Sequence, residues 1–353
     1  MRRVGWLLAA AAVGVFAPTP ALGAGLLAAA AETVCTVSDT RVTELSGLVA
    51  TSSGYVAVND SQWDPAATRV FYLDQRCRVT RTLRYPTPAR DPEDLAVAPD
   101  GTLWVGDIGD NNVERETVAL WRVPPGGGAP VIYRLSYPDR PHDAEALLFT
   151  ADGQPLIITK ELAGPANLYL AAGPLRANTR EGTPLKHVGT FMPVATGVPN
   201  NLGGFGEELV TGAATSPDRS RVALRTYAAT YEWDVPDGDI VKAITTTRPR
   251  VTAMPDEPQG EAVAYTPDGR EFLTVNDEPG KAPVRRYARS TTLAPTAAES
   301  STPPATTAAV TPAAGPSTPA DTNPLLWYGA AAVGLLLAGA GVLGLRRSRR
   351  PQG

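Results

Sequence analysis

The sequence predicts an all-β fold, a β-propeller of five blades, because one unit recurs five times between residues 46 and 277. Each copy is an apolar strand, a tight turn rich in Asp, Gly, Pro or Ser, and a second apolar strand, which is a β-hairpin pattern. A single sheet of this kind cannot bury both faces, so neighbouring copies are expected to stack around an axis. The copies begin at Ser46, Glu93, Glu145, Thr211 and Glu261.

Further apolar segments after most hairpins predict a third and a fourth strand. The third strands are expected at 70–73, 118–121, 167–170 and 229–233, and the fourth at 79–85, 131–137, 187–192 and 240–246. The last copy ends after a third strand near 284–287, while 33–42 is strand-like and precedes the first copy. The N-terminal strand should therefore complete the last blade. The long interval between Glu145 and Thr211 leaves room for a sixth blade as the alternative.

The N-terminal end has the order of a secretory signal peptide, with Arg2 and Arg3 before an apolar run and then small residues. We expect a signal peptide at 1–31, cleaved after Ala24 or after Ala31, with an uncleaved N-terminal anchor as the alternative. The body of the protein is then residues 32–290. The excess of Arg over Lys and the Ala-Pro bias are typical of a GC-rich genome, such as that of an actinobacterium.

The C-terminal end predicts a membrane anchor. Residues 325–345 carry no charge and are long enough, at 1.5 Å per residue, to cross a hydrocarbon core of about 30 Å. The basic tail 346–353 should stay in the cytoplasm, which places the body outside the cell. Residues 291–323 consist mainly of Thr, Ala, Pro and Ser and predict an extended stalk. The expected location is the plasma membrane, in a single pass, with an extracellular ligand or a cell-wall partner.

Composition excludes several classes of function. The chain of 353 residues has a net charge of −4, which argues against a nucleic-acid binder. Two His and two Cys exclude a zinc site with several Cys and His ligands. The sequence also lacks GxSxG, HExxH and GxxxxGK[ST], the signatures of acyl-transfer serines, zinc proteases and phosphate-binding loops.

The two cysteines are expected to form a disulfide. Cys35 lies in the closing strand, and Cys77 lies in the turn between the third and fourth strands of the first blade, which the ring would bring close together. Two cysteines outside the cytoplasm usually pair. The alternative is two buried free thiols.

Acidic residues recur at the same two places in the repeat. In a propeller, the start of the first strand and the end of the second open on the same face, so these residues should converge on one mouth of the axis. Several carboxylates in one cleft repel each other unless a cation lies among them, and carboxylate oxygens favour Ca²⁺ over zinc. The candidate ligands of a cation or a basic ligand are Glu93, Glu145, Glu261, Asp60, Asp107, Asp277 and Glu161.

Three basic residues border the same mouth, namely Lys160, Arg225 and His142. They are candidates for neutralising the acids or for holding an anionic group. Arg225 lies in the middle of an apolar strand, where an unpaired guanidinium is costly, so we expect it to pair with one of the mouth carboxylates. The alternative for the whole set is a solvated polar rim without a specific site.

The strings SGL, DPEDLAVAPDGTLWVGD and GEAVAYTPDG resemble the repeats of secreted bacterial propellers grouped as phytase-like (the "esterase-like activity of phytase" domain), and more loosely those of lactonase and NHL-type propellers. The resemblance covers most of 44–287 and consists of repeat motifs, which mark a fold better than an activity. It implies Ca²⁺ at an acidic mouth and hydrolysis of a phosphate ester by a metal-activated water. No catalytic residue of that family maps individually onto this sequence.

Three functions remain as expectations. The first is an anchored propeller that binds a ligand or protein partner at the acidic mouth, with Ca²⁺ as its cofactor. The second is a Ca²⁺-dependent hydrolase of phosphate esters or lactones. The third is a cell-surface scaffold without a small-molecule site.

Overall fold

The computed structural model describes residues 31–60, 65–126, 128–255, 257–276 and 282–294. The chain divides into two units, Met1–Thr302 and Pro303–Gly353, and the second lies wholly outside the described residues. The predicted signal peptide up to residue 30, the stalk from residue 295, the membrane span 325–345, the tail 346–353 and Asp277 also lie outside them. Neither of the described α-helices has the length and hydropathy needed to span a membrane.

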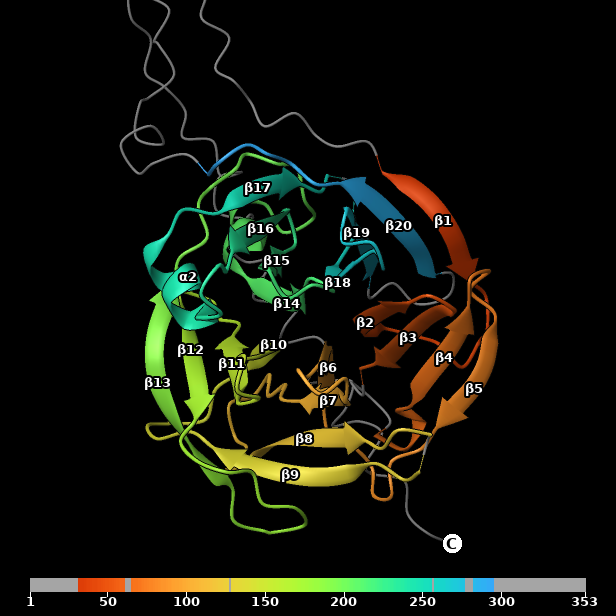
Figure 1. The fold of residues 1–353 in the computed structure, drawn as a ribbon, viewed down its shortest axis with the longest axis vertical. Helices are drawn as coiled ribbons and strands as arrows, with labels where there is room; N and C mark the ends of the chain where they lie inside the picture. Colours follow the sequence, from red (N-terminus) through yellow and green to blue (C-terminus); the bar gives the residue numbers. More distant parts are fainter. Residues whose placement is uncertain (1–30, 61–64, 127, 256, 277–281, 295–353) are drawn as a thin grey trace, which may run out of the picture. The chain divides into compact units, whose positions relative to one another are not determined.

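The described part is a ring of five four-stranded antiparallel blades, as the sequence predicts (Figure 1). Thr183 and Pro184 pair in parallel with Leu135 and Ser136, and this pairing joins the outer strands of blades 2 and 3 into one eight-stranded sheet. Blades 1 to 3 follow the chain in order, with a 3₁₀ turn, η1 (Pro65–Ala67), in blade 1. Blade 1 contains β2 (Leu45–Thr51), β3 (Gly54–Asn59), β4 (Val70–Asp74) and β5 (Val79–Leu83). Blade 2 contains β6 (Pro92–Val97), β7 (Leu103–Asp107), β8 (Val118–Val123) and β9 (Val131–Ser136). Blade 3 contains β10 (Ala144–Phe149), β11 (Pro155–Thr159), β12 (Ala166–Ala171) and β13 (Thr183–Phe191).

Blades 4 and 5 complete the ring, and the N-terminal strand closes it. Strand β1 pairs with β20 as the outer strand of blade 5, so the expected closure is confirmed. The interval that left room for a sixth blade holds the rest of blade 3 and a short helix, α1 (Gly204–Glu208). The strands of blade 4 are β14 (Val210–Thr215), β15 (Arg221–Thr226), β16 (Ala229–Asp234) and β17 (Arg250–Ala253). The strands of blade 5 are β18 (Gly260–Tyr265), β19 (Glu271–Asn276), β20 (Ala282–Ala288) and β1 (Glu32–Val37).

One predicted strand is wrong, because residues 240–246 form a helix, α2 (Ile240–Thr246), and the fourth strand of blade 4 is β17. Asp239 caps this helix by accepting a hydrogen bond from the backbone N–H of Lys242. Ile240, Ala243 and Ile244 recur at helical spacing and are buried against blades 3 and 4. This spacing and the Asp cap are visible in the sequence and favour a helix over a strand.

The cores lie between the blades rather than within them. Buried apolar residues form clusters between blades 1 and 2, 2 and 3, 3 and 4, and 5 and 1, and a smaller cluster lies between blades 4 and 5. Each sheet therefore buries its two faces against its neighbours, which is why a single repeat cannot fold alone. The inner strands β2, β6, β10, β14 and β18 contact one another in order around the axis (Figure 1).

The disulfide between Cys35 and Cys77 is confirmed and joins β1 to the turn between β4 and β5. It links blade 5 to blade 1 across the point where the ring closes. The sequence separation of 42 between the cysteines makes this closure worth about 3 to 4 kcal/mol in the chain-entropy model.

The ring has two distinct faces. We call the face on which the inner strands begin the acidic face, and the opposite one, with the turns between the first and second strands, the hairpin face. The register places Glu32 opposite Arg286, and Ala288 opposite Glu271 beside the β18–β19 turn. Leu293 bridges to Arg250 at the start of β17. The described chain therefore enters and leaves the ring on the hairpin face.

Candidate functional site

Every inner strand begins with a β-bulge, and the bulges coincide with the positions that the sequence repeat singles out. The register with the second strand shifts at this point in all five blades. A bulge bends its strand and re-aims the side chain of the extra residue, and such bulges are frequent beside active sites. The residues at the bulges are all buried, and they are Ser46, Glu93, Glu145, Thr211 and Glu261.

The first group of acids at this end of the axis is Asp60, Asp91 and Glu93, which we call the carboxylate corner. One oxygen of each lies within 4.8 Å of an oxygen of the other two. Asp60 follows β3, and the other two flank Pro92 at the start of β6. Asp60 and Glu93 are 7% and 5% exposed, whereas Asp91 is partly exposed and opens the corner to solvent.

Two neighbours shape the carboxylate corner. Asp107 accepts hydrogen bonds from the backbone N–H groups of Arg90 and Asp91, at 3.1 and 3.0 Å, and so holds the loop that carries Asp91. Gly109 packs directly against the two carboxylates of the β6 start. A Cβ at this position would lie 2.6 Å from Asp91 Oδ2 and closer still to Glu93 Oε1. Only glycine leaves the space between these oxygens open.

Burial and mutual repulsion make the carboxylate corner unfavourable for full ionisation. Burial, a hydrogen bond that protonated Asp91 donates to Asp60, and the negative charges of Asp60 and Asp143 raise the pKa of Asp91 to about 8. Burial and then the charge of Glu145 hold the pKa of Glu93 well above its ordinary value. Within the described ranges, no residue donates a hydrogen bond or supplies a cation to the Glu93 carboxylate. The Glu93 carboxylate therefore has no neutralising partner among the described residues.

The second group contains Glu145, Lys160, Tyr227 and Glu261, and it is largely neutralised. Lys160 forms an ion pair with Glu145 and donates to the Tyr227 hydroxyl at 2.8 Å. Tyr227 in turn donates to Glu261 Oε1 at 3.0 Å. Oε2 of each glutamate is buried and receives no donor from a described residue, and burial raises the pKa of both carboxyls. This group ties blades 3, 4 and 5 together around the axis.

Asp107 and Glu161, two of the predicted ligands, are engaged elsewhere. Asp107 pairs with the buried Arg115 at 2.8 Å and accepts from Trp121 Nε1 at 3.0 Å. Glu161 accepts from Asn167 on β12 at 2.9 Å and lies 3.0 Å from His142 Nδ1. At the end of β11 it is Lys160, one residue earlier, that faces the axial carboxylates.

The basic candidates all have acidic partners. Lys160 neutralises Glu145 rather than remaining free for a ligand. His142 is 2% exposed and contacts Glu161, Asp139 and the Tyr169 hydroxyl, so it acts in a buried hydrogen-bond network.

Arg225 pairs with Glu257, a residue of the loop before β18, and not with a mouth carboxylate. Glu257 also accepts hydrogen bonds from Thr274 at 2.6 Å and Tyr287 at 2.8 Å. Burial disfavours its ionisation, but Arg225 and these donors outweigh burial, so the pKa of Glu257 is lowered. The expected ion pair of Arg225 exists, with a partner that the repeat pattern does not single out.

Sequence reasoning missed Asp91 and Asp143, which lie beside the axial glutamates. Each stands two residues before its glutamate, as Asp91-Pro92-Glu93 and Asp143-Ala144-Glu145. The shared Asp-x-Glu pattern at the start of two repeats is the signal that points to them. Asp143 accepts from the Asp110 backbone N–H at 2.7 Å, which holds the loop after β7 against blade 3.

Comparison with known proteins does not assign the chain to a family. No family model matches the chain, and no curated protein matches its sequence. Similar solved structures include Myxococcus xanthus glutaminyl cyclase (12% identity, TM-score 0.43, covering 74% of this chain and 97% of that one) and the Myceliophteria thermophila Cps50 (Swd1) β-propeller domain (14%, 0.37, 72% and 99%). Kuenenia stuttgartiensis hydrazine synthase matches at 15% identity and TM-score 0.34, over 68% of this chain and 56% of its own. At TM-scores below 0.5 these likenesses assign neither a family nor an activity to this chain.

Proposed function

We propose that this protein is a membrane-anchored extracellular propeller that binds a ligand or protein partner at its acidic face through one Ca²⁺ ion. Asp60, Asp91 and Glu93 would hold the ion. The observation that carries the proposal is the Glu93 carboxylate, which is 5% exposed, has no donor among the described residues and lies beside two further acids. Buried charges are normally paired or bind a metal, so a cation is the expected missing partner.

The ligand class follows from the coordination of Ca²⁺. This ion takes six to eight oxygen ligands, of which three carboxylates supply only part. The remaining positions would open toward solvent on the side of Asp91. A partner that offers carboxylate, phosphate or hydroxyl oxygens, such as a glycan or an acidic peptide, fits these positions.

The resemblance to phytase-like repeats suggests the alternative of a Ca²⁺-dependent phosphoesterase or lactonase. A metal-activated water would attack the ester, and cationic side chains would hold the phosphate. Among the described residues beside the axial acids, the cations Arg115, Lys160 and Arg225 are each paired with a carboxylate. This pairing favours binding over turnover.

Anchoring through residues 325–345 rests on the sequence. The described chain leaves the ring on the hairpin face, beside the start of β17. This arrangement supports presentation of the acidic face to an extracellular partner.

Thermal unfolding of the full chain, stripped of metal and measured with and without millimolar Ca²⁺, tests the proposal. Ca²⁺ at a hundredfold its dissociation constant should stabilise the fold by about 2.7 kcal/mol. Glu93→Gln should abolish this gain, because it removes a ligand charge while preserving volume. Asp237→Asn, at an exposed residue on the loop before α2, is the matched control and should keep the gain.

Two results would replace this function. Absence of a Ca²⁺ effect on the wild type would leave a scaffold without a cation site. Ca²⁺-dependent turnover of p-nitrophenyl phosphate that Glu93→Gln abolishes would make the protein a phosphoesterase instead.

A further inference from the structure

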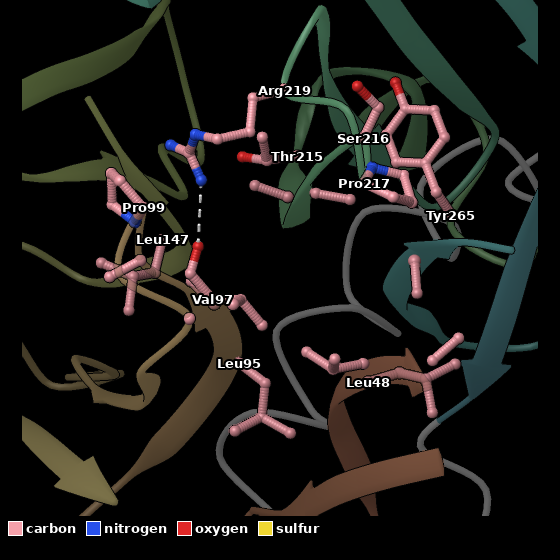
Figure 2. A pocket seen from close by; sticks show the side chains of 18 residues that line it. Leu48, Leu95, Val97, Pro99, Leu147, Thr215, Ser216, Pro217, Arg219 and Tyr265 are labelled. Atoms are coloured by element: carbon pink, nitrogen blue, oxygen red, sulfur yellow. Dashed lines mark hydrogen bonds between the residues drawn. The ribbon is translucent and has the colours of Figure 1, made fainter. Parts of the chain in front are cut away.

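The hairpin face of the ring contains a concavity, at the opposite end of the axis from the carboxylate corner. Its volume is about 310 Å³, and residues of all five inner strands line it. Leu48, Leu95 and Leu147 extend into it from β2, β6 and β10 (Figure 2). The inner strands β14 and β18 contribute mainly small residues, among them Ala213, Ala214 and Ala264, which leave the centre of the ring unfilled.

This cavity is separate from the acidic site. Asp94 is fully buried between the two, and its carboxylate accepts backbone hydrogen bonds from Leu95, Leu147 and Ala213. The residues on either side of it on β6 have opposite roles, because Glu93 belongs to the carboxylate corner and Leu95 lines the cavity. A volume of about 310 Å³ lies at the lower end of the range for small-molecule pockets, about 300 to 1,000 Å³, and favours a small molecule over a protein segment.

Arg219 at the rim of the cavity occupies a position that the repeat normally gives to glycine. The equivalent turn residues Gly101, Gly153 and Gly269 have φ values of 79°, 84° and 69°. Arg219 has a φ of 59°, in the left-handed region that L-residues with a side chain rarely adopt. The turn keeps the geometry of a glycine turn but carries a long cationic side chain at a conformational cost.

The guanidinium of Arg219 lacks an acidic partner. It reaches over the cavity rim toward Val97 and Pro99 (Figure 2). Nη2 donates to the Phe149 carbonyl at 2.9 Å, and Nη1 donates to the Val97 carbonyl at a long 3.4 Å. No carboxylate in the described part of the chain forms an ion pair with it, and burial is the cause that lowers its pKa. Of its five N–H donors, three therefore remain for a ligand.

We propose that the hairpin-face cavity binds a small carboxylic acid with an apolar body, of the medium-chain fatty-acid class. The carboxylate pairs with the Arg219 guanidinium, whose planar fork matches a carboxylate in a bidentate geometry. The alkyl chain lies against Leu48, Leu95 and Leu147. Such a ligand would provide an anion for the Arg219 guanidinium at the rim and apolar contacts for the leucines inside the cavity.

Saturation-transfer difference NMR on the full chain, with octanoate as the probe and octanol as its uncharged analogue, tests this proposal. Arg219→Gly is the decisive variant, because the other turns of the repeat show that glycine adopts this conformation. We expect it to keep or raise the melting temperature and to weaken octanoate binding at least tenfold. Ala214→Leu should also weaken binding by filling the cavity.

Three outcomes would overturn the proposal: no octanoate signal with the wild type, equal binding by Arg219→Gly, or octanol binding as tight as octanoate. Melting curves of both variants show whether the ring remains folded. Glu93→Gln should bind octanoate like the wild type, so failure of the Ca²⁺ proposal and failure of this one remain distinguishable.

Discussion

The Asp94 carboxylate on β6 accepts a hydrogen bond from the backbone N–H of Leu147 on β10, at 2.8 Å, across the boundary between blades 2 and 3. The same oxygen accepts from the backbone N–H of Ala213 on β14 at 3.2 Å, although 119 residues separate the two. The group is fully buried, and burial holds the pKa of Asp94 well above its ordinary value despite these donors. One side chain thus joins the inner strands of three blades.

Replacing Asp94 should destabilise the ring. Asp94→Ala leaves the backbone N–H groups of Leu95, Leu147 and Ala213 without a partner in a buried site, which should cost about 2 to 4 kcal/mol of unfolding free energy. Asp94→Asn should cost less, because its amide oxygen still accepts two of them. Urea unfolding measures both, and equal stability of Asp94→Ala and the wild type would contradict the structural role.

The carboxylate corner can be blocked without removing any carboxylate. Gly109→Ala places a methyl group between Glu93 and Asp91, where a cation would lie. This variant should raise the apparent Kd for Ca²⁺ at least tenfold. The Kd is measured from the melting temperature at increasing Ca²⁺ concentrations. Gly173→Ala is the control, since a Cβ there meets open space. An unchanged Kd in Gly109→Ala would place the ion elsewhere.

The ion pair of Arg225 and Glu257 predicts a pH dependence of stability. The folded-state pKa of Glu257 is lowered, so its ionisation stabilises the fold at neutral pH, and this contribution is lost as the pH falls below the ordinary glutamate range near 4.5. Glu257→Gln should cost about 3 to 5 kcal/mol at pH 7, because it leaves the buried guanidinium unpaired. The difference from the wild type should shrink below pH 4.5 in chemical denaturation, and a constant difference would exclude this linkage.

The disulfide should stabilise the closed ring by holding blade 5 against blade 1. Replacing Cys35 and Cys77 by alanine, or reducing the bond, should lower the unfolding free energy by about 3 to 4 kcal/mol. Hydrogen exchange should show the greatest loss of protection in β1 and β20, which the bond holds against blade 1. Uniform loss around the ring would argue against a role in closure.

Much of the fold is readable from local sequence because the repeat is local. Two apolar segments and a turn between them predict each hairpin. The last copy lacks a fourth strand, which predicts that β1 closes the ring. Residues 240–246 depart from the repeat, because the apolar segment at the place of a fourth strand forms helix α2. The cap at Asp239 and the spacing of Ile240, Ala243 and Ile244 indicate a helix instead.

The candidate site was only partly readable. The repeat indicates which residues stand at the inner-strand starts, and the bulges at these positions turn Glu93, Glu145 and Glu261 toward shared neighbours. It does not indicate which acids are neutralised, because the partners come from other blades. Tyr227 reaches Glu261 from 34 residues away, and Lys160 reaches Tyr227 from 67.

By itself, the sequence predicted the propeller class, five blades with six as the alternative, the closing strand, and the disulfide with free thiols as the alternative. Short-range strand and turn patterns and a count of cysteines carry these predictions. Only the tertiary structure decided that Asp91 lies beside Asp60 and Glu93 and that Glu161 pairs elsewhere. It also decided that Arg219 lies at the rim of an apolar cavity. These outcomes depend on side chains that converge on the axis from different blades. Their pairing depends on distance and burial, which no single repeat encodes.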